Sequence, residues 1–223
     1  MITQMKYIEY HDYIKRDAII YAYLLDNFSY VCKQIKAWES ITIDREHVLL
    51  VKSGTLIEES DGKKKGIVRC FFQKNLIFPT RNPVVLKALE TSEICLISAE
   101  GVFGKLEEDQ ILSNFFLQIA EKNEQDLKRQ ALLGIENSKN KVVSTLNFLL
   151  ENNLSNTTLP VFPEWLQINI LAKLANCSIS TISSTVNELH NKGMLDIKSS
   201  PWKLKGREMR LEYFERDVQK VAD

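Results

Sequence analysis

Short apolar runs separated by turn residues occupy the first half of the chain. The runs have strand length and are rich in β-branched and aromatic side chains, and Gly, Pro, Asn and Asp gather between them. Their spacing of about ten residues is typical of a small antiparallel roll or sandwich. The predicted strands are Ile41–Ile43, Val48–Lys52, Leu56–Glu58, Ile67–Phe72 and Ile94–Ile97. Ahead of them, the pattern of Tyr13–Ile35 predicts a helix.

The middle of the chain has helical spacing instead. Between Glu107 and Leu133 there is neither Pro nor Gly, and apolar residues recur at helical intervals. This predicts a helix of about 40 Å at ~1.5 Å per residue. We expect a second copy of the chain to cover its apolar stripe, with polar residues on the stripe setting the register; packing against the chain's own strands is the alternative. The predicted seam consists of Ile111, Phe115, Ile119, Asn123, Leu127 and Gln130.

Gly134 is predicted to end this helix, and Asn137 is placed to cap the next one, Ser138–Glu151. The segment between them is the expected hinge. The sequence therefore predicts a β-roll sensor domain at residues 1–106, a dimerisation helix and hinge at 107–137, and a C-terminal domain at 138–223.

Two short amphipathic helices joined by a tight turn are predicted within residues 167–195. Leu171 and Leu174 form the inner face of the first helix, and the small Ala172 lets a second helix cross close above it. Asn176 lies at the turn, where Asn is the best non-glycine residue for left-handed backbone. Ser178 is placed to cap the second helix. That helix is expected to bury Ile182, Val186 and Leu189 and to expose Ile179, Ser180, Ser183, Ser184 and Asn187.

A basic hairpin is predicted directly after these helices. Lys192-Gly193 ends the second helix, Leu195–Lys198 opens the hairpin, residues 199–206 form its polar tip, and its return strand is placed at about Glu208–Tyr213. Any two short amphipathic helices with a tight turn give a similar helix–turn–helix pattern. The basic hairpin, which would be a wing, favours the DNA-binding interpretation.

Charge and composition narrow the class of protein. The chain carries 29 Lys and Arg against 29 Asp and Glu, but the balance is −2 over residues 1–137 and +2 over residues 138–223. Neutrality thus excludes only a uniformly cationic nucleic-acid binder. With 44% apolar residues the chain can form an ordinary core, which excludes a disordered or low-complexity protein.

Several other classes have no support in the sequence. No run of eighteen apolar residues exists and no secretory signal is visible, so we expect a cytoplasmic protein without a membrane partner. The four cysteines lie far apart and match no disulfide framework or metal cluster, so reduced thiols and no metal are expected. No nucleophile motif or phosphate loop accompanies Asp26, Glu58 or Glu59, so no enzymatic activity is expected.

The segment from Leu171-Ala172 through Asn176-Cys177-Ser178 to Lys192-Gly193-Met194-Leu195 resembles the winged helix–turn–helix of the cyclic-AMP receptor/fumarate-nitrate regulator (CRP/FNR) superfamily of bacterial transcription factors. The order of predicted elements is similar to that family over nearly the whole chain, with Val51–Leu56 as the clearest match in the roll. The serine-rich second helix is similar to that of the PrfA-type branch.

The resemblance implies an α+β fold with an N-terminal antiparallel β-roll of the cyclic-nucleotide-binding type, a long dimerisation helix and a C-terminal winged helix–turn–helix. It further implies a homodimeric transcription regulator, of the activator type, that binds palindromic operators in double-stranded DNA, with RNA polymerase as a further partner. A ligand-sensing or protein-interaction dimer without specific DNA binding is the alternative.

Carried over to this sequence, the family's base-reading positions fall on Ile179, Ser180 and Ser184. Many family members have Arg and Glu there, and Arg can bind guanine with two hydrogen bonds, which Ile and Ser cannot. We therefore expect backbone contacts and DNA shape to supply more of the specificity than direct readout does. The other candidate DNA-binding residues are the phosphate-contact positions Gln167, Asn169, Ser178 and Thr181, the outer-face residues Ser183 and Asn187, and the wing residues Lys203 and Lys205.

The family's cyclic-nucleotide signature is missing from the corresponding segment, residues 75–85. The family holds the phosphate with Gly-Glu and a downstream Arg-Ser/Thr-Ala, whereas here Arg81 precedes Asn82-Pro83 and the loop is too short for the family's helical cassette. No cyclic-nucleotide cofactor is therefore expected. The cysteine cluster of iron–sulfur sensors is also missing, and His11 and His47 fit surface or structural roles better than haem ligation. A small-molecule effector stays open, since PrfA-type relatives can bind glutathione.

Overall fold

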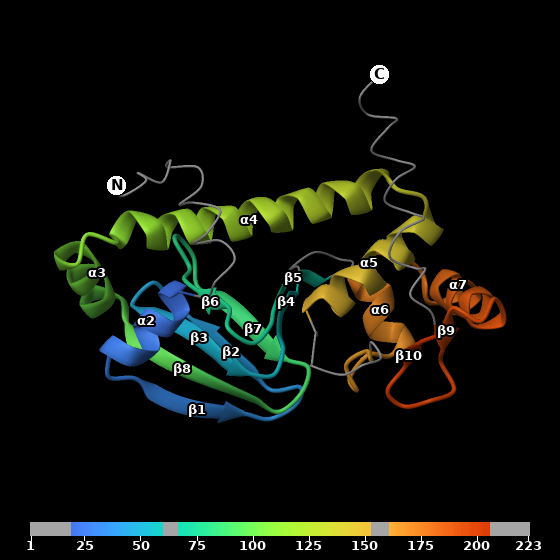
Figure 1. Ribbon diagram of the computed structural model, residues 1–223, viewed down its shortest axis with the longest axis horizontal. Helices are drawn as coiled ribbons and strands as arrows, with labels where there is room; N and C mark the ends of the chain where they lie inside the picture. Colours follow the sequence, from blue (N-terminus) through green and yellow to red (C-terminus); the bar gives the residue numbers. More distant parts are fainter. Residues whose placement is uncertain (1–18, 60–66, 153–160, 206–223) are drawn as a thin grey trace, which may run out of the picture. The chain divides into compact units, whose positions relative to one another are not determined.

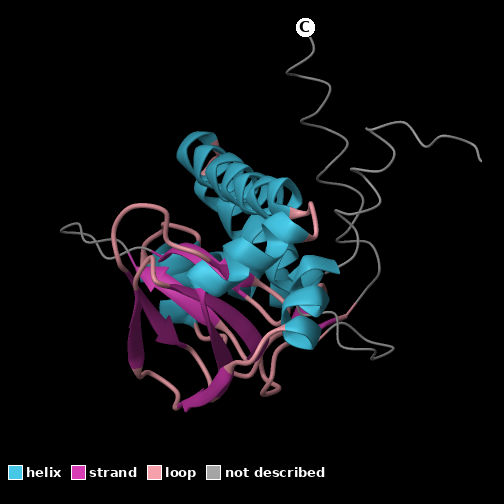
Figure 2. Cartoon of the chain, turned by 90° about the vertical axis from the view of Figure 1, so that its left-hand side faces the viewer, coloured by secondary structure: helices cyan, strands magenta, loops and turns pink. Residues whose placement is uncertain are grey.

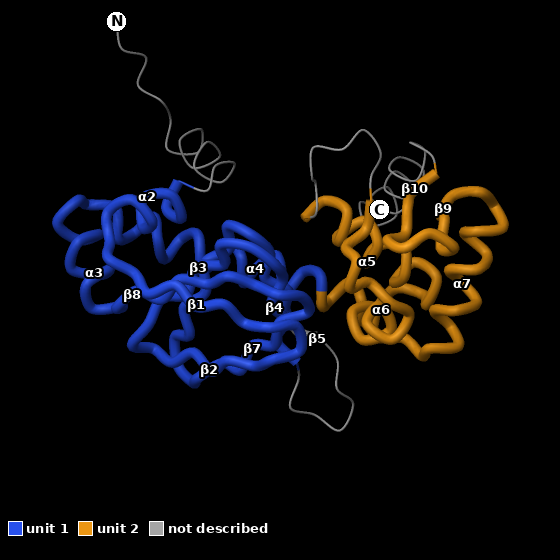
Figure 3. The backbone as a smooth tube through the Cα atoms, turned by 90° about the horizontal axis from the view of Figure 1, so that it is seen from below, with its two compact units in different colours: residues 1–61, 68–129 blue, residues 62–67, 130–223 orange. Residues whose placement is uncertain are grey.

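The computed structural model describes residues 19–59, 67–152 and 161–205. Residues up to Ser98 are mainly strands, and residues from Ala99 onward are mainly helices (Figure 1). The chain divides into two compact units, residues 1–61 with 68–129 and residues 62–67 with 130–223 (Figure 3). Unit 1 and its border contain α2 (Ile19–Asn27), β1 (Val31–Ile35), β2 (Ser40–Ile43), β3 (His47–Ser53), β4 (Leu56–Glu59), β5 (Ile67–Phe71), β6 (Leu76–Ile77), β7 (Val84–Ala88), β8 (Ser92–Ser98), α3 (Ala99–Glu108) and the start of α4 (Leu112–Ile135).

Two sheets form the β-roll of unit 1, whose strands are magenta in Figure 2. Each sheet has four strands, in the orders β1-β8-β3-β6 and β2-β7-β4-β5. The pairings determined within them are antiparallel. Side chains from both sheets, among them Leu49, Val51 and Leu86, form one buried cluster, which is the interior of the roll. The described part of the chain therefore has the predicted β-roll.

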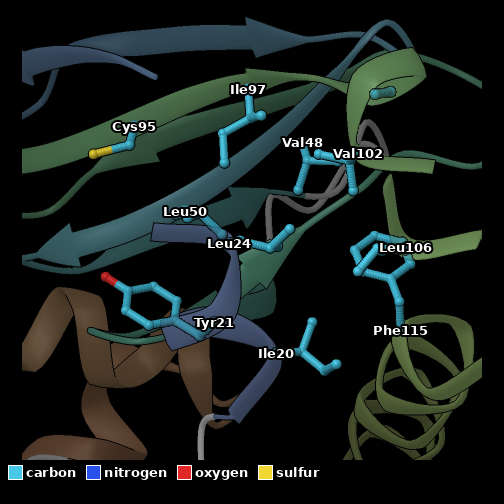
Figure 4. Packing of buried hydrophobic residues seen from close by; sticks show 11 residues of the cluster. Ile20, Tyr21, Leu24, Val48, Leu50, Cys95, Ile97, Val102, Leu106 and Phe115 are labelled. Carbon is cyan, nitrogen blue, oxygen red and sulfur yellow. The ribbon is translucent and has the colours of Figure 1, made fainter. Parts of the chain in front are cut away.

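Strand β3 is apolar at four consecutive positions because both of its faces are covered. Alternate side chains of a strand point to opposite faces, so Leu49 and Val51 face the roll interior while Val48 and Leu50 face outward. On that outer side a second cluster packs Val48 and Leu50 against α2, α3 and the first turn of α4 (Figure 4). Phe115 is the α4 residue buried in this second cluster.

The predicted helix Tyr13–Ile35 is correct only in part. Helix α2 spans Ile19–Asn27, whereas Val31–Ile35 is strand β1, which pairs with β8 along five residues; Tyr13 and the residues up to 18 lie outside the described residues. Pairing with β8 supplies backbone hydrogen bonds that the local sequence pattern does not reveal. Strands β6 and β7 were not predicted either, because β6 is two residues long and β7 directly follows a proline turn.

The predicted helix from Glu107 to Leu133 is also corrected. Helix α3 ends at Glu108 and α4 begins only at Leu112, because Gln110 adopts left-handed backbone (φ 58°). The N–H of Ile111 donates to Leu106 O and that of Gln110 to Glu107 O, the paired bonds of a Schellman helix end. Helix α4 then continues past Gly134 to Ile135.

Unit 2 contains α5 (Ser138–Asn152), α6 (Ile168–Leu174), α7 (Ile179–Asn191), β9 (Leu195–Asp196) and β10 (Lys203–Leu204). The predicted cap of α5 is confirmed, since Asn137 Oδ1 accepts from the N–H of Asn140 at 2.9 Å. The buried faces of α5, α6 and α7 form the core of this unit.

Candidate nucleic-acid interface

The turn between α6 and α7 has the geometry that the sequence predicts. Asn176 is left-handed (φ 49°), and the N–H of Cys177 donates to Ala172 O at 3.0 Å, closing the end of α6. Ala172 and Leu174 are both buried in α6. The tight turn sets where α7 begins after α6.

Ser178 begins α7 as its N-cap. Its Oγ accepts from the N–H of Thr181 at 3.1 Å, as predicted, and lies 2.8 Å from both Ser180 Oγ and Thr181 Oγ1. The three hydroxyls therefore form a cluster at the first turn of the helix. Ser178 and Ser180 are exposed, and Thr181 is half-buried.

The outer face of α7 is open and made of short side chains. Ile179 is 61% exposed, Ser184 and Asn187 are exposed, and Ser183 is half-buried. The opposite face buries Ile182, Val186 and Leu189, as predicted, and Thr185 joins them. Short side chains let the backbone of α7 approach another molecule closely.

An ion-pair group holds α7 against α5. Glu188 Oε1 of α7 lies 2.6 Å from Lys139 Nζ of α5 and 2.6 Å from Lys192 Nζ at the end of α7. The hydrogen bond from Lys139, followed by that from Lys192, lowers the pKa of Glu188 to about 2. Lys192 is thus partly neutralised at this site, although it counted among the basic residues of the C-terminal part.

Strands β9 and β10 form a short antiparallel hairpin, the predicted wing, with Lys203 opposite Asp196 and Leu204 opposite Leu195. The return strand is Lys203–Leu204 and so comes earlier than predicted; the expected strand Glu208–Tyr213 lies outside the described residues. Burial explains this register, because it places Leu204 opposite Leu195, and both of these apolar side chains are buried.

The two candidate wing lysines differ in their surroundings. Lys203 is exposed and makes no ion pair with the described part of the chain, while its backbone bridges to Val161. Lys205 Nζ lies 3.6 Å from Asp196 Oδ2. Lys203 therefore presents the less compensated charge.

The candidate phosphate contacts at the start of α6 are also exposed. Gln167 is the N-cap residue of α6 but its side chain makes no capping bond. The Oδ1 of Asn169 accepts from the N–H of Ile170 at 2.8 Å. Unit 2 thus brings together on one body all the candidate DNA-binding residues, from α6, α7 and the wing.

The predicted seam along α4 is only partly available to a second chain. Phe115 is fully buried in the chain's own core, Ile119 packs against that core, and Ile111 precedes the helix and packs there too. Phe115 therefore has no surface left for a second chain, because the outer face of the roll uses it as cover, whereas Ile111 and Ile119 are half-buried and keep part of theirs. The seam as a whole stays a prediction. Asn123, Leu127 and Gln130 are exposed, and Asn123 Oδ1 accepts from Arg69 Nη1 at 3.2 Å.

Sequence reasoning missed two features of this surface. Phe116 is 43% exposed on α4 and lies on the same side as Leu127, eleven residues or about three helical turns further along. The Lys139–Glu188 contact joins residues 49 positions apart in the chain, and a local sequence pattern cannot predict such a pair. For Phe116, the spacing to Asn123 and Leu127 was the available signal.

The segment aligned with the family's nucleotide cassette is a plain connection. Residues 78–83 between β6 and β7 form no helix, and Arg81 is exposed. His47 Nδ1 lies 2.9 Å from Asp44 Oδ1 at the start of β3, while His11 lies outside the described residues. No group of three or more metal-binding side chains and no helix able to cross a membrane occurs within residues 19–59, 67–152 and 161–205.

Comparison with known proteins supports the fold. No family model and no curated protein matches the sequence. Among solved structures, the chain is similar to FixK2 from Bradyrhizobium japonicum (13% identity, TM-score 0.72, 82% of this chain and 96% of that one). It is also similar to a cyclic nucleotide-binding domain containing protein from Listeria monocytogenes EGD-e (17% identity, TM-score 0.68, 85% of this chain and 98% of that one).

A further neighbour is the CRP/FNR family regulator TTHA1359 from Thermus thermophilus (14% identity, TM-score 0.62, 81% of this chain and 96% of that one). These neighbours do not identify the PrfA-type branch, so that finer resemblance stays a prediction. At these identities the likeness concerns the fold alone. The chain has the fold of the CRP/FNR regulators, an antiparallel β-roll and a long helix followed by a winged helix–turn–helix.

Proposed function

We propose that this protein is a sequence-specific DNA-binding transcription regulator that acts as a homodimer on palindromic operators. The observation that carries the proposal is α7 itself. Its outer face is open, its first turn holds three hydroxyls, and the helix lies on the same body as the Lys203 wing. A helix presented in this way fits the major groove, with the wing at the neighbouring backbone.

The chemistry of α7 predicts how DNA would be read. The hydroxyls of Ser178, Ser180 and Thr181 can donate to phosphate oxygens, as can the exposed N–H groups of a helix N-terminus. Ile179 can pack on a thymine methyl, and Ser184 can bond a base edge without strong discrimination. Specificity would thus depend largely on DNA shape and on the spacing of two half-sites about 34 Å apart.

The exposed side of α4 supports the homodimer. Phe116, Asn123 and Leu127 are exposed at intervals that place them on one side of the helix, with the small Ala120 and Ala131 between and after them. Leu127 is 69% exposed, which is costly for a lone chain in water. A second α4 packed here would bury this row, and the seam would run through Phe116 instead of Phe115.

Binding to random and selected duplexes tests the proposal. Affinity should fall steeply as salt rises, since phosphate contacts release counterions, and selection from random duplexes should recover a roughly palindromic operator. A sensor roll without the nucleotide signature also makes it informative to repeat the selection with a small-molecule extract. No binding at low salt and no protected operator would instead favour a ligand-sensing or protein-interaction dimer.

Two variants separate backbone contacts from base readout. Lys203→Ala should weaken binding to all duplexes alike and reduce the salt slope by about one charge, because it removes one phosphate contact. Ser184→Ala should change base preference within the operator and leave non-specific affinity intact. Matched controls are Lys33→Ala and Ser113→Ala, exposed residues of the same types on β1 and α4. A preference unchanged by Ser184→Ala would remove this side chain from the readout.

A further inference from the structure

Two thiols of the β-roll lie side by side on neighbouring strands. Cys32 of β1 is the register partner of Cys95 of β8, and their Sγ atoms are 3.0 Å apart. The other two cysteines are elsewhere, Cys70 on β5 of the second sheet and Cys177 in the turn of unit 2. The two sulfurs are therefore a pair set by the sheet itself.

Strand register gives this pair the backbone geometry of a disulfide. Residues directly opposite each other on antiparallel strands have Cα atoms about 4.5 or 5.5 Å apart. Both separations lie within the ~4.4–6.8 Å range that disulfides span. Rotation of the side chains can therefore join the sulfurs without moving either strand.

The two thiols differ in their exposure to solvent. Cys32 is exposed, whereas Cys95 is fully buried and belongs to the apolar cluster on the outer face of the sheet (Figure 4). Burial, together with the hydrogen bond and charge of Cys32, raises the pKa of Cys95 to about 12. An oxidant from solvent would thus meet Cys32 first.

Lys52 of β3 provides a positive charge beside the pair. Its Nζ lies 2.9 Å from Glu93 Oε1, and its charge acts to lower the pKa of Cys95, against the larger effect of burial. The thiolate is the reactive form of cysteine, and a neighbouring cation favours it. An exposed thiol, a positive charge and a second thiol thus lie together in the sheet.

We propose that Cys32 and Cys95 form a peroxide-responsive thiol pair. The Cys32 thiolate attacks a hydroperoxide and its sulfur takes the terminal oxygen, so that the O–O bond breaks and Cys32 becomes a sulfenic acid. The leaving alkoxide, or hydroxide from hydrogen peroxide, takes up from solvent the proton that Cys32 released on ionising and departs as an alcohol or as water. The Cys95 sulfur then attacks the Cys32 sulfur, the S–O bond breaks, and water leaves with the Cys95 proton. Two thiols lose two electrons to the peroxide, and a thiol reductant returns them by exchange.

The product bond would fasten the edge strand β1 to β8 within the sheet. Both cysteines and Lys52 belong to unit 1, so the pair can react whether or not the chain binds DNA.

Peroxide treatment of the reduced full-length chain tests this proposal. Alkylation should find two thiols fewer after treatment with hydrogen peroxide, and digestion should yield a peptide linking Cys32 to Cys95 that dithiothreitol releases. The variant with both Cys70→Ala and Cys177→Ala should respond like the natural chain, whereas Cys32→Ser should not. Four thiols persisting at peroxide levels that oxidise free cysteine, or a bond through Cys70, Cys177 or a second chain, would overturn it.

A trapping experiment tests whether the sulfenic acid forms on Cys32. In Cys95→Ala the sulfenic acid has no partner, so a 1,3-diketone such as dimedone should label Cys32 after peroxide treatment, in proportion to the oxidant. The natural chain should give little adduct, because Cys95 consumes the intermediate. Equal labelling of the natural chain and Cys95→Ala would show that Cys95 resolves nothing and would likewise contradict the proposal.

Discussion

Within the described residues, Gly193, Asn176 and Gln110 have left-handed backbone at the ends of helices, and the sequence reveals them to different degrees. Gly193 ends α7 and Asn176 ends α6, both with residue types that favour this conformation. Gln110 ends α3 with the same paired hydrogen bonds but has no such preference. The first two ends were therefore predictable from single residues, whereas the break before α4 was not.

Gly54 is a residue whose identity the fold requires. Its backbone is left-handed (φ 86°), and a Cβ there would lie 2.7 Å from Ser92 Cβ and 2.8 Å from Ser92 Cα. Gly54→Ala should therefore lower the free energy of unfolding by at least about 1 kcal/mol, measured by denaturant unfolding. Gly101→Ala is the control, because nothing lies within 4 Å of its Cβ position and alanine favours helix. An unchanged stability in Gly54→Ala would contradict the close approach.

Asp126 of α4 is a buried acid whose charge opposes folding. Its Oδ2 has no hydrogen-bond partner among the described residues, and burial raises its pKa against the opposing charges of Lys122 and Arg129. A raised pKa means that the ionised form is less stable in the folded than in the unfolded chain. Above the pKa that Asp126 has in the folded chain, its ionised carboxylate lowers the free energy of unfolding. This destabilisation should disappear as the pH falls through that pKa and the group becomes protonated.

Asp126→Asn should accordingly raise the thermal midpoint at pH 7, since the amide keeps the shape and removes the charge. The difference from the natural chain should shrink as acid protonates Asp126 and vanish below about pH 4, the usual range of free Asp. Thermal unfolding followed by circular dichroism across this range measures both effects. A midpoint at pH 7 equal to or below that of the natural chain would show that the carboxylate is compensated.

At the scale of elements, α7 depends on contacts from outside its own segment. Its cap and its end are local, but beside its buried apolar face it also contacts α5 through Glu188, whose pKa the two lysines lower to about 2. A lowered pKa means stability that is present above the usual value of 4.5 and is lost as the pH falls toward about 2.

Glu188→Gln should thus lower the stability of unit 2 at pH 7, because the amide cannot pair with two ammonium groups. The gap between Glu188→Gln and the natural chain should close as the pH falls from 4.5 to about 2. Glu151→Gln, at an exposed position of α5, is the control. Hydrogen exchange of α7 amides reports the effect locally; a gap that does not change with pH would rule out the charge as its source.

At the scale of the whole molecule, the exposed row of α4 is the face through which we propose that the chain dimerises. Leu127→Glu would place a charge in the proposed seam and should weaken dimerisation by tenfold or more, about 1.4 kcal/mol or above. Gln125→Glu adds the same charge to an exposed position away from Leu127 and should leave the dimer intact. Analytical ultracentrifugation over a range of concentrations distinguishes them, and equal dimer constants for both variants would place the interface elsewhere.

Much of the local structure of this protein could be predicted from single residues and their neighbours in the sequence. The turn of the helix–turn–helix, its cap at Ser178, its buried face and the stop at Gly193 all rest on contacts within a few positions, so the local sequence determined them. The same holds for the apolar strands of the roll, whose composition reports burial.

Only the tertiary structure decided which faces are covered. Phe115 and Phe116 are adjacent and chemically identical, yet one is fully buried and the other is 43% exposed, because the outer face of the roll selects between them. Likewise, residues 31–35 form strand β1 because they pair with β8 through backbone hydrogen bonds. The register of that pairing places Cys32 opposite Cys95. Such contacts join residues far apart in the chain, and no local pattern contains them.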